Sequence, residues 1–251
     1  MGASMISDEV LSKRTAFLKM TALFSELKSE DLEILAKKFR ARDYKRKDII
    51  FHQGDDSAVL YVVKKGKVRI FGLSPAGNET SYRIFSRHDV IGEFAAIDGR
   101  PRSTTAQALE SSTLLEIKRD QFLQFIYQMP DLAMGMIKLL VEKLRFTTTY
   151  TDSMIQDDTT GRLLNMILQY NEMHGVELEA GKIYELDLFM RQEDIATMVG
   201  ARREWVNRIL SKWNKQGLIE YKRGKIKILD LPAFEKERDR RIGFLKDGDE
   251  W

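Results

Sequence analysis

The stretch from Gln192 to Asp230 constrains most strongly what this chain can fold into. Residues Gln192–Val199 show the apolar spacing of a short helix, and the following Gly200 supplies the positive φ that a tight turn between helices needs. A second helix is predicted from about Ala201 to Gln216. Its apolar residues recur at helical spacing and form one stripe for a core: Val206, Ile209, Leu210 and Trp213.

A small hairpin is predicted after the second helix. Gly217 stands where a helix C-cap is expected. Leu218–Tyr221 and Ile226–Asp230 then have the composition of two strands around a turn at residues 222–225. Helix, turn, helix and hairpin in this order are typical of a winged helix-turn-helix.

Basic residues concentrate in this same stretch. Between residues 202 and 227, nine basic residues oppose two acidic ones, a local charge of +7 in a chain whose total is +3. The side of the second helix opposite the apolar stripe carries Glu204, Arg208, Ser211 and Lys215. Such a helix can enter the DNA major groove, where arginine pairs with guanine and glutamate accepts from cytosine. A solvated basic helix in a two-helix hairpin is the alternative.

The candidate DNA-contacting residues come from the second helix and from the hairpin. In the hairpin, Arg223 and Lys225 are expected to contact phosphate rather than bases. The full candidate set is Arg202, Arg203, Glu204, Arg208, Lys212, Arg223 and Lys225.

The cysteine and histidine content of the chain argues against several kinds of disulfide, metal and cofactor site. The chain has no cysteine, which excludes disulfides, cysteine-ligated zinc and cysteine-ligated iron–sulfur clusters. Its three histidines, His52, His88 and His174, are scattered and carry no supporting motif, so neither a metal nor haem is expected. Because no nucleophile–base pattern is visible either, the sequence does not indicate an enzyme.

The length of 251 residues suggests one large or two modest domains. Residues Met1–Lys19 carry charges where a secretion signal would have an apolar core. The most apolar helical run, Leu132–Val141, is interrupted by Lys138 and is too short to span a bilayer. We therefore expect a cytoplasmic protein with no membrane partner.

The first half of the chain predicts two helices and then a β-rich domain. Ser7–Lys19 and Ser29–Arg40 are helical by pattern. From residue 48 to residue 118, short apolar or alternating runs lie between turn residues, which favours a sandwich or small barrel. The expected strands are Ile49–His52, Leu60–Lys64, Val68–Leu73, Thr80–Phe85, Ser103–Ala108 and Thr113–Lys118.

A long helix is predicted after a short one at Asp120–Tyr127. It begins at Pro130-Asp131 and has two apolar sides. One side steps in a heptad register through Ile137, Leu140, Leu144, Thr147, Thr151 and Met154. The other side is expected to pack back on the barrel through Met136, Leu139, Lys143 and Phe146. A helix with two apolar sides favours a homodimer, the alternative being a helix buried within one domain.

The domain boundary is expected at Asp157-Asp158. Asp158 is a suitable N-cap for a helix at Thr159–Tyr170. A loop is expected from Gly175 to Gly181, followed by a short strand at Ile183–Leu188. We therefore predict a sensor domain at residues 1–130, a dimerisation helix at 131–157 and a DNA-binding domain at 158–251.

The segment from Ile91 to Thr104 contains the parts of an anion site. Gly92 would let backbone N–H groups approach a ligand, and Arg102 offers a planar fork of donors to a phosphate. Ser103 offers a hydroxyl, and Glu93 could accept from a sugar hydroxyl. A Gly-Arg-Pro turn with a surface arginine is the alternative.

Sensor segment, long helix and winged helix-turn-helix in this order resemble the cyclic-AMP receptor protein/FNR superfamily of bacterial transcription regulators. The resemblance covers roughly Leu23 to Asp230. It rests on Gly92-Glu93 with Arg102-Ser103, on residues 159–164 (TTGRLL), and on the pattern of residues 195–208. It implies an α+β architecture: an N-terminal cyclic-nucleotide-binding β-barrel (jelly roll), a dimerisation helix and a C-terminal winged helix-turn-helix.

The resemblance also implies roles for individual residues. It implies cAMP or another cyclic nucleotide as effector, with the ribose and cyclic phosphate bound by Gly92, Glu93, Arg102, Ser103 and Thr104. Thr147 and Thr148 match the positions that contact adenine, and Arg203, Glu204 and Arg208 match the residues that read base edges. The implied partners are a second copy of the chain, near-palindromic double-stranded DNA and RNA polymerase, as in a transcription activator.

Two other functions remain open on the sequence. One is a regulator of the same fold that is ligand-independent or senses a different small molecule. The other is a cyclic-nucleotide-binding regulatory subunit that acts through protein contacts. The chain departs from the family pattern at Arg191, Arg202 and Trp205, where Thr, Ser and Thr are usual, and no role is assigned to the tail at 232–251.

Overall fold

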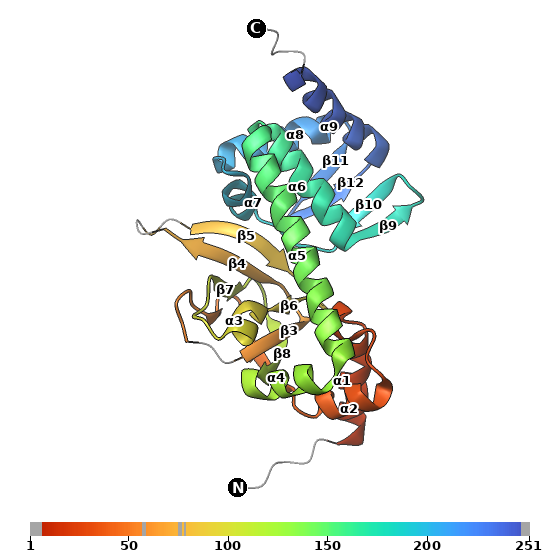
Figure 1. Ribbon diagram of the computed structural model, residues 1–251. Helices are drawn as coiled ribbons and strands as arrows, with labels where there is room; N and C mark the ends of the chain where they lie inside the picture. The colour runs from red at the N-terminus through yellow and green to blue at the C-terminus, as the bar shows by residue number, and fades with distance from the viewer. Residues whose placement is uncertain (1–6, 57–58, 75–76, 78, 247–251) are drawn as a thin grey trace. The chain divides into compact units, whose positions relative to one another are not determined.

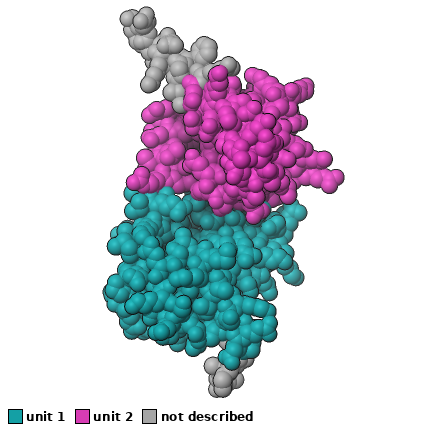
Figure 2. All heavy atoms as spheres, turned by 90° about the vertical axis from the view of Figure 1, so that its right-hand side faces the viewer, with its two compact units in different colours: residues 1–144 teal, residues 145–251 magenta. Residues whose placement is uncertain are grey.

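The computed structural model describes residues 7–56, 59–74, 77 and 79–246. The first residues of the segment examined for a secretion signal, 1–6, lie outside this range. The chain divides into two compact units, residues 1–144 and 145–251 (Figure 2). The division falls within one helix, α5 (Pro130–Gln156). The predicted three-part division, with a separate helical domain at 131–157, stays a prediction.

The described part of the N-terminal unit contains two four-stranded antiparallel sheets with the strand orders β1-β8-β3-β6 and β2-β7-β4-β5. Their inward side chains form a common core that includes Tyr44 and Tyr61 from the first sheet and Phe51 and Phe85 from the second. The predicted barrel is therefore a double-sheet jelly roll. The strands are β1 (Arg40–Tyr44), β2 (Ile49–Phe51), β3 (Val59–Lys65), β4 (Val68–Leu73), β5 (Glu79–Phe85), β6 (Val90–Ile91), β7 (Thr105–Ala108) and β8 (Ser112–Lys118).

Strand β3 is buried on both of its faces. Tyr61 and Val63 lie in the core between the sheets, whereas Leu60 and Val62 lie in a second core beneath the helices. Because successive strand residues point to opposite faces, burial on both sides requires the continuous apolar run that the sequence shows.

The second core is built by helices at one end of the barrel (Figure 1). They are α1 (Asp8–Lys19), the 3₁₀ helix η1 (Ala22–Phe24), α2 (Ser29–Ala36), α4 (Arg119–Gln128) and the first turns of α5. The first half of α5 contributes Leu132, Met136 and Leu139 to this core. A further short helix, α3 (Glu93–Asp98), follows β6.

The predicted elements of this unit differ from the structure in four places. The helix predicted at Ser29–Arg40 ends at Ala36, because Arg40 begins strand β1. Strand β1 was not predicted, since its first four residues are exposed on both faces and show no alternation. The two-residue strand β6 was also missed, and the strand predicted at Ser103–Ala108 begins at Thr105.

Helix α5 has one buried and one exposed apolar side within the N-terminal unit. Met136 and Leu139 are buried, as predicted. On the predicted seam, Ile137 and Leu144 remain 53% and 66% exposed. Phe146, the last residue of the predicted inward side, belongs to the C-terminal unit and makes an edge-to-face contact with Tyr170, with ring centroids 6.4 Å apart. Its packing on the barrel stays a prediction.

The C-terminal unit begins with the last turns of α5 and with α6 (Thr159–His174). As predicted, Asp158 caps α6, and its Oδ1 accepts from the Gly161 N–H at 2.7 Å. A four-stranded antiparallel sheet of order β11-β12-β10-β9 follows in the described residues. Its strands are β9 (Gly175–Glu179), β10 (Ile183–Leu186), β11 (Ile219–Lys222) and β12 (Lys225–Ile228). Residues 175–181 were predicted as a loop; they contain β9, whose residues are mostly exposed and therefore lack an apolar pattern.

The helix-turn-helix forms as predicted. Helix α7 spans Gln192–Val199, and Gly200 turns the chain with a φ of 65°. Helix α8 (Arg203–Lys215) begins two residues later than predicted. Val206, Leu210 and Trp213 are buried, so the predicted stripe faces the core. The α+β architecture of barrel, long helix and winged helix-turn-helix is thus confirmed.

The tail forms a helix, α9 (Leu231–Lys246), that joins the core of this unit. Asp230 caps it by accepting from the Ala233 N–H at 3.0 Å. Phe234 is fully buried and meets Trp213 of α8 edge to face, with ring centroids 5.2 Å apart. The tail therefore supports the back of α8.

Replacing Phe234 with alanine should destabilise the C-terminal unit by about 3–5 kcal/mol, because a cavity opens beside Trp213. Denaturant unfolding followed by tryptophan fluorescence measures this change. The control is Leu178→Ala on exposed strand β9, which should change the unfolding free energy by less than about 0.5 kcal/mol. Equal effects of the two substitutions would contradict the packing role of α9.

Candidate effector site and nucleic-acid interface

Arg102 is the centre of the sensor segment. It is only 3% exposed, although a surface arginine was the alternative interpretation of this segment. Its Nη1 donates to the Gly92 carbonyl at 2.7 Å, and its Nη2 donates to the Val59 carbonyl at 2.5 Å. The guanidinium therefore links the N-cap of α3 to the start of β3.

Position 92 favours glycine for two reasons, its backbone conformation and its close approach to Arg102. Its φ is 78°, in the left-handed region that residues with a Cβ disfavour. A Cβ at this position would lie 2.3 Å from Arg102 Nη1. The sequence predicted a close approach of a ligand to Gly92; the structure shows a close approach of Arg102.

The Arg102 guanidinium lies over aromatic rings in the barrel interior. Its Cζ is 4.1 Å from the Phe51 ring centroid and 5.8 Å from that of Tyr61. Burial lowers the pKa of Arg102, while Tyr61, Glu93 and Asp55 act in the opposite direction. The Nε of Arg102 is buried without a hydrogen-bond partner among the described residues.

Glu93 is paired with a lysine of the long helix. Glu93 Oε1 lies 2.8 Å from Lys143 Nζ, and both side chains are nearly buried. Lys143 Nζ also donates to the Val90 carbonyl at 2.8 Å. The sequence predicts Lys143 on the side of α5 that faces the barrel, but no motif marks it as a site residue.

Three charged side chains meet in this cluster: Arg102, Glu93 and Lys143. The two terminal nitrogens of Arg102 donate to carbonyls, and Asp55 acts as a further negative charge on its guanidinium. The Nε of Arg102 remains a buried donor without a partner among the described residues. A buried, unpaired N–H of a cationic group favours an anionic acceptor.

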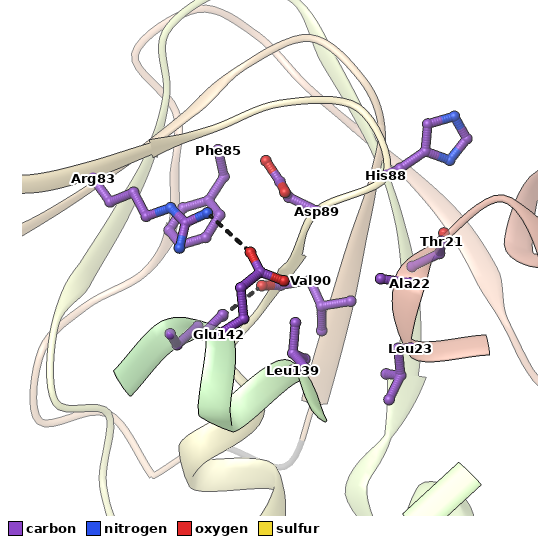
Figure 3. A pocket seen from close by; sticks show the side chains of 11 residues that line it. Thr21, Ala22, Leu23, Arg83, Phe85, His88, Asp89, Val90, Leu139 and Glu142 are labelled. Atoms are coloured by element: carbon purple, nitrogen blue, oxygen red, sulfur yellow. Dashed lines mark hydrogen bonds and ion pairs between the residues drawn. The ribbon is translucent and has the colours of Figure 1, made fainter. Parts of the chain in front are cut away.

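A second ion pair joins α5 to strand β5 beside this cluster (Figure 3). Arg83 is buried and lies over the Phe85 ring, 4.8 Å from its centroid, and its Nη2 is 3.8 Å from Glu142 Oε1. Lys143 Nζ lies 4.9 Å from the same centroid. Two successive residues of α5 are thus tied to the barrel, which no sequence spacing indicated because the partners are far apart in the chain.

The remaining predicted effector residues are Ser103, Thr104, Thr147 and Thr148. Ser103 is exposed and Thr104 is half-buried. Thr147 and Thr148 are exposed residues of α5 that belong to the C-terminal unit. Their roles in ligand binding stay predictions.

The predicted DNA-contacting residues are all exposed: Arg202, Arg203, Glu204, Arg208, Lys212, Arg223 and Lys225. Two of them have acidic partners that the sequence did not reveal. Arg203 Nε lies 3.1 Å from Glu193 Oε1, and Lys225 Nζ lies 3.0 Å from Glu185 Oε1. Their contacts with DNA stay predictions.

The hairpin turn is fixed by two left-handed residues, Arg223 and Gly224, with φ values of 51° and 84°. A two-residue turn of this kind matches the twist of the two strands. A Cβ on Gly224 would lie 2.4 Å from the Phe189 ring, so the turn packs closely on that side chain.

Arg191 replaces the threonine N-cap that is usual before α7. It makes no cap hydrogen bond and instead directs its guanidinium to Asp194, with Nε–Oδ2 and Nη2–Oδ1 distances of 3.0 and 3.3 Å. Asp194 is 1% exposed, so this pairing satisfies a buried carboxylate.

The described residues contain no group of three or more His, Asp or Glu side chains that could hold a metal ion. His88 stacks on Phe17 with ring centroids 4.5 Å apart, and His174 lies against Tyr170 at 6.1 Å. Within the same ranges, none of the helices combines the length and the apolar character that crossing a bilayer requires.

Comparisons with known proteins match both units. The family model "Cyclic nucleotide-binding domain" matches residues 41–128, and "Crp-like helix-turn-helix domain" matches residues 161–237. A "CRP-like cAMP-activated global transcriptional regulator" of Mycobacterium tuberculosis is 27% identical and covers 89% of this chain and 96% of its own length. A "Cyclic AMP receptor protein" of Thermus thermophilus is 26% identical, with 87% and 97% covered.

The fold is also similar to solved structures. A CooA mutant from Carboxydothermus hydrogenoformans superposes with a TM-score of 0.70 at 22% identity, covering 90% of this chain and 99% of that one. At this identity the likeness concerns the fold alone.

Replacing Gly92 with alanine should displace the Arg102 guanidinium and impose a left-handed φ on alanine. The matched control is Gly54→Ala, where φ is 87° and no atom lies within 4 Å of the added Cβ. The control should lose about 1–2 kcal/mol of stability, and Gly92→Ala should lose more. Denaturant unfolding measures both, and equal losses would show that Arg102 does not depend on Gly92.

Proposed function

We propose a function for this chain from its family: it belongs to the cyclic-AMP receptor protein/FNR superfamily of transcription regulators. The proposed function is that of a homodimeric, sequence-specific DNA-binding regulator controlled by cAMP or another cyclic nucleotide. The observation that carries the effector proposal is the buried Arg102 guanidinium, whose Nε lacks a hydrogen-bond partner among the described residues. A cyclic nucleotide carries one negative charge on its phosphate.

In this proposal, Arg102 holds the cyclic phosphate, with Ser103 and Thr104 beside it. Gly92 and Glu93 bind the ribose, and Thr147 and Thr148 contact the base. The bound nucleotide would supply an anionic acceptor for the buried guanidinium of Arg102. Lys143 holds the Glu93 side chain in place through their ion pair.

One observation favours a second candidate. The two terminal nitrogens of Arg102 already donate to protein carbonyls, so the cluster is organised without a ligand. A regulator of the same fold that is independent of ligand, or that senses a different small anion, would have this arrangement too. Both candidates predict DNA binding.

The exposed apolar side of α5 supports a homodimer. Met134, Ile137, Val141 and Leu144 are each 44% or more exposed and lie on one side of the helix. Paired with a second copy, this side would be buried as in a coiled coil. Two recognition helices about 34 Å apart would read a near-palindromic site in successive major grooves. RNA polymerase is the further partner of such a regulator, which acts in the cytoplasm.

Effector control would pass through α5. Glu142 and Lys143 of this helix contact Arg83 and Glu93 of the barrel, and α5 continues to Gln156. A ligand that binds beside Glu93 changes the balance of these pairs and favours one position of the helix. The resulting change in DNA affinity cannot exceed the preference of the ligand for that position.

Replacing Arg208 with alanine should cost about 1–3 kcal/mol of binding to a duplex selected by the parent protein, and should relax the choice of one base pair in each half-site. Arg223→Ala is the comparison, because a lost phosphate contact weakens all sequences equally and lowers the salt slope by about one. Fluorescence anisotropy over a salt series separates the two effects. Unchanged discrimination by Arg208→Ala would contradict the role assigned to α8.

A further inference from the structure

We propose that Glu193 is a positioning residue for base recognition by Arg203. It holds the Nε of Arg203, directs the two terminal nitrogens toward DNA, and weakens binding to DNA that lacks the matching base. This inference rests on the proposed DNA-binding function and concerns a residue of α7 that is outside the predicted DNA-contacting set.

The contact joins the first turns of two helices. Glu193 is the second residue of α7 and Arg203 is the first residue of α8. Glu193 Oε1 lies 3.1 Å from Arg203 Nε, and the two side chains are 54% and 61% exposed. The pair therefore lies on the surface at the start of the recognition helix.

A neighbouring contact repeats the arrangement one turn further along α8. Gln192 Nε2 donates to Asn207 Oδ1 at 3.0 Å, and Asn207 follows Arg203 by four residues on the same side of the helix. Two successive residues of α7 thus hold two side chains on successive turns of α8. This repetition indicates that α7 organises one edge of the recognition surface.

The geometry of arginine gives this contact a consequence for recognition. A guanidinium has five N–H donors in a rigid planar fork, and a guanine base accepts two of them at O6 and N7. When Glu193 engages Nε, the two terminal nitrogens remain as a pair for the base. The fork then enters the groove in one orientation instead of several.

A third side chain fixes the surroundings of the pair. Tyr221 of β11 donates its hydroxyl to the Met190 carbonyl at 3.0 Å. Burial raises the pKa of Tyr221, as do Glu193 and Asp194, whereas Arg203 lowers it. Tyr221 is therefore within electrostatic range of both members of the pair.

The charge of Glu193 has a separate effect on DNA affinity. An exposed ion pair in water contributes little to the stability of the free protein. An acidic side chain beside the phosphate backbone opposes non-specific binding, which depends on cation–phosphate contacts. When DNA excludes water from the pair, the attraction between Glu193 and Arg203 strengthens. The acidic side chain of Glu193 can therefore lie near the DNA only while Arg203 remains paired with it. Glu193 should therefore raise the ratio of specific to non-specific affinity.

Two substitutions separate orientation from charge. Glu193→Gln keeps an acceptor oxygen and removes the charge, whereas Glu193→Ala removes both. The control is Glu179→Ala, because Glu179 pairs with Lys182 at 3.5 Å with similar exposures of 54% and 51%, but this pair lies at the end of β9 and in the turn that follows it. Each variant is compared with the parent on three probes: a duplex that the parent selects from a randomised pool, its single-base-pair variants, and an unrelated duplex of equal length.

At one base pair of each half-site, the Glu193→Ala variant should discriminate about tenfold less than the parent between the selected duplex and its single-base-pair variants. This is the scale of one mismatched base pair. Glu193→Gln should keep most of that discrimination but bind the unrelated duplex more tightly. Glu179→Ala should change neither quantity. In combination with Arg203→Ala, Glu193→Ala should cause no further loss of discrimination.

Full discrimination by Glu193→Ala, at an unfolding midpoint equal to that of the parent, would overturn the inference and leave the DNA-binding function intact. A uniform weakening of binding to all duplexes by Glu193→Ala would also overturn the inference and leave the DNA-binding function intact. Failure of the parent to select any duplex would overturn the proposed function, and this inference with it.

Discussion

Burial of the Arg102 guanidinium is the constraint on which the sensor unit depends. A guanidinium withdrawn from water needs acceptors and counter-charge, because burial alone disfavours its charged form. The carbonyls of Gly92 and Val59 supply acceptors, and Phe51 supplies an aromatic face. The Nε of Arg102 still lacks an acceptor among the described residues. The same arrangement that forces glycine at position 92 therefore leaves the site suited to an anion.

The long helix α5 carries two charged residues that meet the barrel. Its successive residues Glu142 and Lys143 meet opposite charges from β5 and α3, so one turn of the helix is held by two ion pairs of different burial. The pair with Glu93 is nearly buried, and the pair with Arg83 is looser, at 3.8 Å. Under the proposed effector control, a ligand that changes one of these pairs would act on α5.

Local sequence patterns predict most of the helices and strands, whereas the side-chain pairs of the sites depend on contacts between segments that are far apart in the chain. The spacing of Val206, Leu210 and Trp213 places α8 correctly, because helical periodicity is a property of neighbouring residues. Strand β1 was not predicted, because its exposed residues show no alternation of apolar and polar side chains. The pairing of Lys143 with Glu93 joins positions 50 residues apart. Glu193 and Arg203 lie in separate helices, so only the turn at Gly200 brings them together.

Calorimetric titration of the full chain with cAMP and, separately, with cGMP, repeated on Arg102→Ala, tests directly whether the Arg102 cluster binds a cyclic nucleotide. We expect binding of one of these nucleotides in the micromolar range by the parent and none by the variant, because the buried positive charge is removed. An absence of heat with both nucleotides, from a parent protein that still binds duplex DNA, would contradict this expectation. The cluster around Arg102 would then be a structural feature of a regulator that senses something else.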